Sequence, residues 1–145
     1  MEPDKEYFSQ PHDSGLARSK ARIASACEDL FFVSETDAPV EPVEFPNMTE
    51  LSPAALREAL DRGDEEPVKS ADATEFFDRL TRPQEWHIET EKEVTRRFLH
   101  LRDVMENELE DIHLFRVGKV QVEIFVIGRT PGGTIAGVRT RAVET

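Results

Sequence analysis

The chain has little cysteine and no long hydrophobic run. Its single cysteine, Cys27, excludes an intramolecular disulfide, and its place among apolar residues at helical spacing predicts a small buried side chain. No segment approaches the roughly 20 apolar residues of a membrane-spanning helix. The first residues are acidic and lack the basic and then apolar pattern of a signal peptide. We therefore expect no membrane partner and a cytoplasmic location.

Basic residues are also scarce relative to acidic ones. The 145-residue chain has 18 Lys and Arg against 30 Asp and Glu, which gives a net charge of −12. Such a chain should repel nucleic acid and anionic membranes and be attracted to basic surfaces. We expect no direct nucleic-acid partner. An acidic surface suits a protein partner whose cleft attracts phosphates, but acidic soluble proteins are common, and charge alone leaves both interpretations open.

The length of the chain predicts one domain. The length and the lack of an internal repeat indicate a single domain over residues 13–145, preceded by a disordered tail at residues 1–12. Hydrophobic residues are sparse in the first 20 residues and again around residues 61–72, so we expect both stretches to be mobile. Segment 36–46 holds three prolines, which restricts any strand there to the edge of a sheet or to a loop.

Helices are expected at about residues 13–29, 49–62 and 89–109, with a short one after Asp72. Ser52 fits the N-cap of the second helix, and Gly63 would end it. Asp72 together with Glu75 has the spacing of a capping box. The longest helix has one apolar stripe at helical spacing, made of Val94, Phe98, Leu101, Met105 and Leu109. The segment 31–33, just after the first helix, is apolar and should be packed.

Three strands are expected to follow as an antiparallel meander, at residues 112–117, 120–128 and 134–145. The middle strand has Val120, Val122, Ile124 and Val126 on one face and Phe125 and Ile127 on the other. Apolar residues on both faces indicate a central strand that is covered on two sides. The helices precede the meander and do not separate its strands, so the fold class is α+β. A strand-like pattern runs to Thr145, which would hold that residue on a rigid element, although a domain can also simply end on a strand.

A set of short motifs occurs in one order along the chain. They are Asp29–Glu35, Phe76-Phe77, Gln84-Glu85-Trp86-His87, Glu91-Lys92, Phe115–Gly118, Val126–Gly128, Thr130-Pro131, Ala136-Gly137 and Val143–Thr145. Each motif alone is weak, but the ordered set resembles the nuclease A inhibitor family. The resemblance implies an α/β/α sandwich with a central antiparallel sheet, a C-terminal three-strand meander and flanking helices. It also implies a monomeric inhibitor that forms a one-to-one complex with a magnesium-dependent nuclease acting on both DNA and RNA.

The resemblance further implies which residues bind the nuclease. Taken alone, Trp86 lies among polar neighbours and is either an exposed anchor or an edge of the core. Glu35 alone would be a solvated loop acid. The family's pattern makes Glu35, Gln84 and Trp86 partner contacts and directs Thr145 toward the Mg²⁺ of the bound nuclease; Asp37 matches less well. The alternative is an interaction module on the same scaffold with a different partner, because segment 36–46 and the N-terminal extension match the family least.

Catalytic arrangements are poor, and we expect no enzyme, no cofactor and no metal held by the chain itself. The spacing of the histidines, which are His12, His87, His100 and His113, does not match that of metal-binding motifs. Asp111 and His113 are two residues apart on an expected strand and should share a face. Two ligands cannot hold a catalytic zinc.

Overall fold

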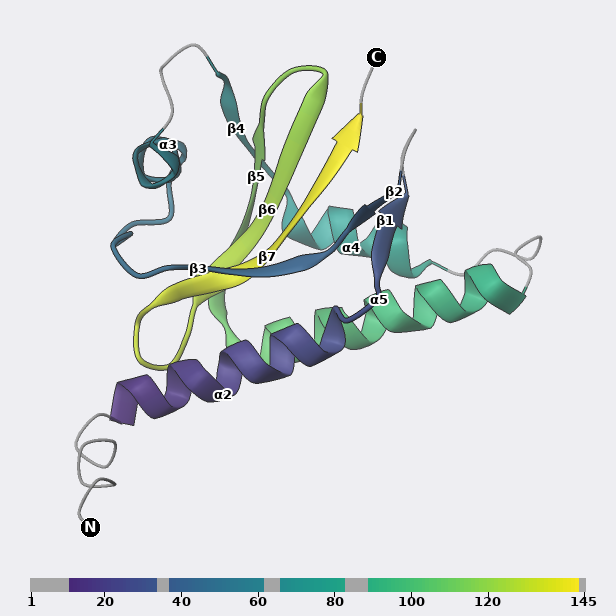
Figure 1. Ribbon diagram of the computed structural model, residues 1–145, viewed down its shortest axis with the longest axis horizontal. Helices are drawn as coiled ribbons and strands as arrows, with labels where there is room; N and C mark the ends of the chain where they lie inside the picture. The colour runs from purple at the N-terminus through teal and green to yellow at the C-terminus, as the bar shows by residue number, and fades with distance from the viewer. Residues whose placement is uncertain (1–10, 34–36, 62–65, 83–88, 144–145) are drawn as a thin grey trace.

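The computed structural model describes residues 11–33, 37–61, 66–82 and 89–143, and its centre is a five-stranded antiparallel sheet (Figure 1). The strands are β3 (Glu41–Phe45), β4 (Val68–Ala71), β5 (Glu110–Val117), β6 (Gln121–Arg129) and β7 (Ile135–Val143), in the order β3-β7-β6-β5-β4. A separate two-stranded hairpin joins β1 (Phe31–Val33) to β2 (Asp37–Pro39). The expected meander is therefore β5-β6-β7, at the middle of the sheet.

Helices cover both faces of the sheet. Helices α2 (Pro11–Ala26), α4 (Ala73–Thr81) and α5 (Glu89–Glu108) lie on one face, and α3 (Pro53–Leu60) lies on the other. Each face has its own core, and the side chains of β6 divide between them. Val122, Ile124 and Val126 pack under α2, α4 and α5, whereas Phe125 and Ile127 pack under α3. This confirms the α+β class and the two-sided central strand, but the predicted place of Val120 on that strand is wrong, because β6 begins at Gln121 and Val120 is 53% exposed.

The short helices begin as their sequences predict. The Ser52 side chain accepts a hydrogen bond from the backbone N–H of Ala55 at 3.1 Å, as an N-cap does. The Asp72 carboxylate accepts hydrogen bonds from Thr74 and Glu75 in the same way. Helix α3 is shorter than the expected 49–62, because it begins only after its Ser52 N-cap and ends where Asp61 adopts a left-handed conformation with φ of 55°. The predicted stop at Gly63 lies outside the described residues.

The apolar stripe of α5 is confirmed except at its start. Phe98, Leu101, Met105 and Leu109 are all buried. Val94 is 38% exposed, so its predicted place in the core is wrong. The first turns of α5, which include residue 94, extend beyond the edge of the sheet (Figure 1).

Two expectations about mobile segments are wrong. Residues 68–71, within the stretch expected to be mobile, form the edge strand β4, which pairs with β5 from Val68↔Val117 to Ala71↔Leu114. An exposed edge strand needs few apolar residues, and this explains the low hydrophobicity there. Helix α2 begins at Pro11, so the last two residues of the predicted tail belong to a helix. Among the described residues, no helix is both long and apolar enough to cross a membrane.

Candidate functional site

The four predicted partner-binding residues lie outside the described residues. Glu35 belongs to segment 34–36, Gln84 and Trp86 to segment 83–88, and Thr145 to segment 144–145. The structure does describe the elements on either side of these segments. They are the β1–β2 hairpin, the pair of helices α4 and α5, and the end of β7. How these elements are held determines where the four residues can be presented.

The β1–β2 hairpin flanks Glu35 and is seated on the rest of the molecule by its inner face. Phe32 stacks on Phe76 of α4, with ring centroids 5.8 Å apart and an angle of 28° between the planes. The Ala38 carbonyl oxygen accepts a hydrogen bond from the Thr140 hydroxyl of β7 at 3.4 Å. The hairpin therefore touches both other elements of the candidate site.

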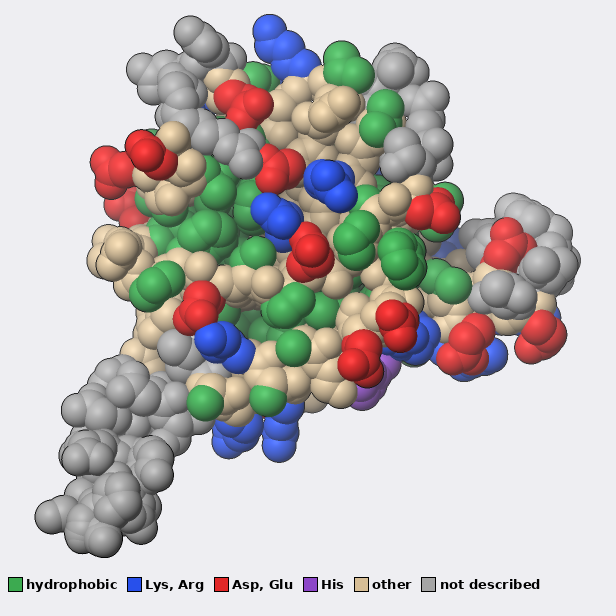
Figure 2. Space-filling model, in the orientation of Figure 1, with side chains coloured by type: hydrophobic (Ala, Val, Ile, Leu, Met, Phe, Trp, Pro, Cys, Tyr) green, Lys and Arg blue, Asp and Glu red, His purple; other side chains and the backbone are tan. Residues whose placement is uncertain are grey.

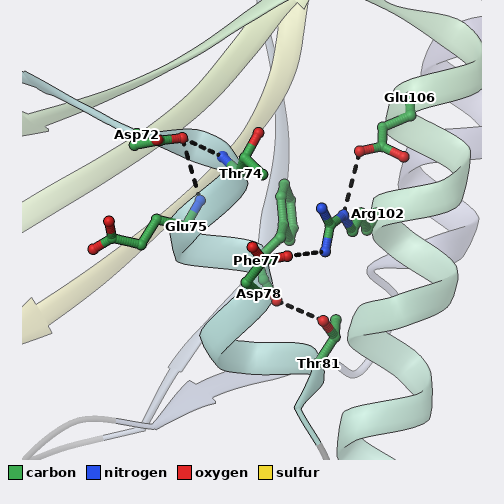
Figure 3. Close-up of polar contacts among 8 residues, drawn as sticks. All are labelled: Asp72, Thr74, Glu75, Phe77, Asp78, Thr81, Arg102 and Glu106. Carbon is green, nitrogen blue, oxygen red and sulfur yellow. Dashed lines mark hydrogen bonds and ion pairs between the residues drawn. The ribbon is translucent and has the colours of Figure 1, made fainter.

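Helices α4 and α5 flank Gln84 and Trp86, and Arg102 joins the two helices (Figure 3). Its guanidinium is 2.8 Å from the Asp78 carboxylate on α4 and 3.2 Å from Glu106 on α5. It also lies over the Phe77 ring, 5.9 Å from the centroid. The hydrogen bond to Asp78, reinforced by Glu106, raises the pKa of Arg102, so this side chain is a permanent cation between the two helices.

The end of β7 lies against the hairpin. Val143, its last residue, pairs with Gln121 at the start of β6. A cleft of about 230 Å³ lies where this strand end meets β2 and is lined by Ala38, Gln121, Arg141, Ala142 and Val143. Figure 1 shows the hairpin and the end of β7 on the same side of the molecule, with α4 and α5 converging farther out. The structure thus brings together the elements that lead to the predicted residues.

Sequence reasoning missed a buried carboxylate that ties α2 to the end of α5. Glu108 is 4% exposed, and its oxygens accept hydrogen bonds from the Ser19 hydroxyl at 2.9 Å and from Arg22 at 2.8 Å. Arg18 lies 3.6 Å away. A signal was present in the sequence, because Glu108 follows Met105 by three residues and so lies on the apolar stripe of α5.

Burial alone would raise the pKa of the Glu108 carboxyl. The hydrogen bonds from Ser19 and Arg22 and the positive charges of Arg18 and Arg22 outweigh burial, and the pKa is lowered. Glu108 is therefore an ionised group held in a structural contact. The cation that contacts it most closely, Arg22, remains largely in water, with its side chain 59% exposed.

The groups that could perform chemistry are arranged poorly for it. Cys27 is 3% exposed, and burial raises the pKa of its thiol, which disfavours the reactive thiolate. His113 and Asp111 do share a face, with Nε2 3.0 Å from Oδ1, as expected. Within the described part of the chain, no three His, Cys, Asp or Glu residues are grouped so that they could hold a metal ion.

A family model described as "NuiA: Nuclease A inhibitor-like protein" matches residues 18–145. No curated protein matches the chain. The matched range takes in every strand of the structure and all three elements of the candidate site.

Proposed function

The chain belongs to the nuclease A inhibitor-like family, whose members are inhibitors and not enzymes, and we propose that it blocks the active site of a sugar-non-specific, magnesium-dependent nuclease. The observation that carries this proposal is the family match over residues 18–145, which includes the segments of all four predicted contact residues. The hairpin packs against both α4 and β7, and α4 is joined to α5, which supports a single contact surface.

Thr145 is the residue proposed to approach the catalytic metal of the nuclease. Mg²⁺ is a hard cation that prefers oxygen ligands and keeps exchangeable waters. The hydroxyl of Thr145 would offer an oxygen where a substrate phosphate would otherwise bind. Strand β7 is suited to present such a residue because it pairs with β6 up to Val143. The chain itself supplies no chemical step; it occupies the site and excludes the substrate.

Glu35, Gln84 and Trp86 are proposed to hold the inhibitor in register around that contact. A tryptophan anchor contributes large contact area at the centre of an interface. A carboxylate at Glu35 suits a cleft that binds phosphates, because such a cleft carries positive charge. We propose that the chain acts as a monomer in a one-to-one complex, in the cytoplasm.

The test is an inhibition and binding series against a purified sugar-non-specific nuclease from the organism that encodes the chain, with duplex DNA as substrate. Thr145→Val removes the hydroxyl alone, deletion of Thr145 removes the residue, and a short tag placed directly after Thr145 crowds the hydroxyl. All three should weaken inhibition, because each withdraws or crowds an oxygen directed at the metal. An N-terminal tag is the matched control and should leave inhibition unchanged.

Two further variants separate the proposed contacts from the fold. Trp86→Ala should weaken binding by about 2 kcal/mol or more, as hot-spot truncations do, while thermal stability hardly changes. Glu35→Gln should reduce affinity more at low salt than at high salt. A parent chain that neither binds nor inhibits the nuclease would reject the proposed function and favour an interaction module with a different partner.

A further inference from the structure

The outer face of the β1–β2 hairpin exposes two large apolar side chains side by side. Phe31 is 46% exposed and Val33 is 65% exposed. The other large hydrophobic residues exposed within the described part of the chain are Val94, Leu99 and Val120. Single exposed apolar residues are normal on protein surfaces. Two of them at alternate positions of one strand form a small continuous apolar surface, because alternate residues share a face.

The register of the hairpin defines this outer face. Phe31 pairs with Pro39, and Val33 pairs with Asp37, so these four side chains lie on the same side of the two strands. The residues between them point the other way: Phe32 stacks on Phe76, and Ala38 is 4% exposed. Because the inner face is packed, the hairpin cannot turn over to bury the outer one. The expected packing of segment 31–33 is therefore wrong for its two outer residues.

The charges around this surface indicate what could cover it. Glu28 and Asp29 precede the hairpin and Asp37 lies on it, and all three are exposed. Figure 2 shows hydrophobic side chains over the hairpin, with acidic side chains near them. An apolar centre with a polar rim is typical of protein interfaces. Two copies of a chain with net charge −12 would bring acidic rims together, which disfavours a second copy and favours a partner with basic residues.

We propose that Phe31 and Val33 are an apolar anchor that binds the nuclease on the rim of its active-site cleft. This inference rests on the proposed function, because the occupant is the nuclease. Val33 and Asp37 directly flank segment 34–36, which contains Glu35, so the anchor is continuous with the proposed interface. The partner surface would be an apolar patch bordered by the basic residues that bind phosphates. Burying the pair on binding would add apolar contact area next to the charged contact of Glu35.

The test compares two double variants in calorimetric binding to the same nuclease. Phe31→Thr with Val33→Thr removes the anchor and keeps residues that favour strands. Val94→Gln with Leu99→Gln is the matched control, because these α5 residues have similar exposures of 38% and 46%. We expect the anchor variant to bind about 30-fold more weakly, as loss of a hot spot does, and the control variant to bind like the parent.

Two features of the loss identify an apolar contact. The fold-change should be the same at low and high salt, whereas the loss from Glu35→Gln should shrink as salt increases. The heat-capacity change on binding should become less negative in the anchor variant, because less apolar surface is buried. Thermal unfolding should be unchanged, since both side chains are exposed in the free protein. If the double variant fails to fold, Val33→Thr is measured alone. We expect it to lose affinity for the nuclease several-fold, and an affinity equal to that of the parent would overturn the anchor.

Three other outcomes would reject the anchor, the proposed function or the nuclease as the occupant of this surface. Equal binding by the parent and a folded anchor variant, with inhibition intact, rejects the anchor and leaves the proposed function standing. A parent that does not bind the nuclease rejects both. A parent that self-associates in sedimentation, with an anchor variant that is monomeric, assigns the surface to a second copy and rejects the nuclease as its occupant.

Discussion

At the scale of single residues, Glu108 shows how a charge can be buried without being isolated. The carboxylate gains two hydrogen bonds from α2, and the closer of the two arginines near it keeps contact with water. Such an arrangement offsets part of the cost of removing the carboxylate from solvent. The contact connects the last turn of α5 to the middle of α2, two helices that are far apart in sequence. Its contribution to stability should therefore depend on the ionisation of this one group.

Glu108→Gln should lower the free energy of unfolding by about 1–3 kcal/mol at neutral pH, since the amide cannot replace a carboxylate that accepts from Ser19 and Arg22. The pKa of Glu108 in the folded state is lowered, so its stabilisation is present above the ordinary carboxyl pKa of about 4.3 and is lost as pH falls through the folded value. The difference between parent and variant should accordingly shrink in acid. Urea unfolding at neutral and acidic pH measures this.

The control for Glu108 is Glu110→Gln, an exposed neighbour on β5. It should change stability little at either pH. A Glu108→Gln penalty that is the same at neutral and acidic pH would contradict the assigned charge contact.

At the scale of elements, local signals predicted the helices and the meander well. Ser52 and Asp72 cap the helices that they were expected to cap, because a cap depends on only a few neighbouring residues. The alternation of β6 predicted both cores, since a strand has a fixed two-residue period. Edge strand β4 was missed because an exposed edge has no such alternation. The contacts of Arg102 with Asp78 and of Phe32 with Phe76 could not be predicted, because they join elements distant in sequence.

The candidate site was only partly accessible to sequence reasoning. Resemblance pointed to Glu35, Gln84, Trp86 and Thr145, and these assignments remain predictions because all four lie outside the described residues. The structure adds how their flanking elements are held together. The exposure of Phe31 and Val33 could not be inferred from an apolar triplet, because which residues of a short strand face outward depends on where its partner strand lies.

Arg102→Met tests whether the pairing of α4 with α5 positions the segment that carries Trp86. Methionine keeps apolar contact with Phe77 but removes the ion pairs with Asp78 and Glu106. We expect a stability loss of about 1 kcal/mol or less and a several-fold loss of nuclease affinity. In a double-mutant cycle with Trp86→Ala, the two effects on affinity should be less than additive, because both act through one contact.

The matched control is Arg96→Met, whose ion pair with Glu93 lies within α5 alone. It should leave affinity unchanged. If Arg102→Met and Trp86→Ala have strictly additive effects on affinity, Arg102 does not act through the segment that contains Trp86.

At the scale of the whole molecule, the two cores support different parts of its surface. The larger one joins the sheet to α2, α4 and α5 and holds the hairpin, so every element next to a predicted contact residue rests on it. The smaller one lies under α3, away from those elements. The net charge of −12 is a further property of the molecule as a whole, and by itself it did not distinguish an inhibitor from an ordinary acidic protein. Because the family binds nucleases, we can test whether the negative charge contributes to binding of the nuclease.

The final prediction concerns how charge guides association with the nuclease. Opposite charges accelerate encounter over distances of about a Debye length, roughly 10 Å at 0.1 M salt. Raising salt from about 0.05 M to about 0.5 M should slow association at least about tenfold and change dissociation little, as measured by stopped flow. We compare two double variants of exposed acidic residues: Glu28→Gln with Asp37→Asn at the hairpin, and Glu50→Gln with Glu58→Gln near α3. The hairpin variant should slow association more than the α3 variant. Equal slowing by both pairs would mean that total charge, and not an acidic rim on the hairpin, guides the encounter.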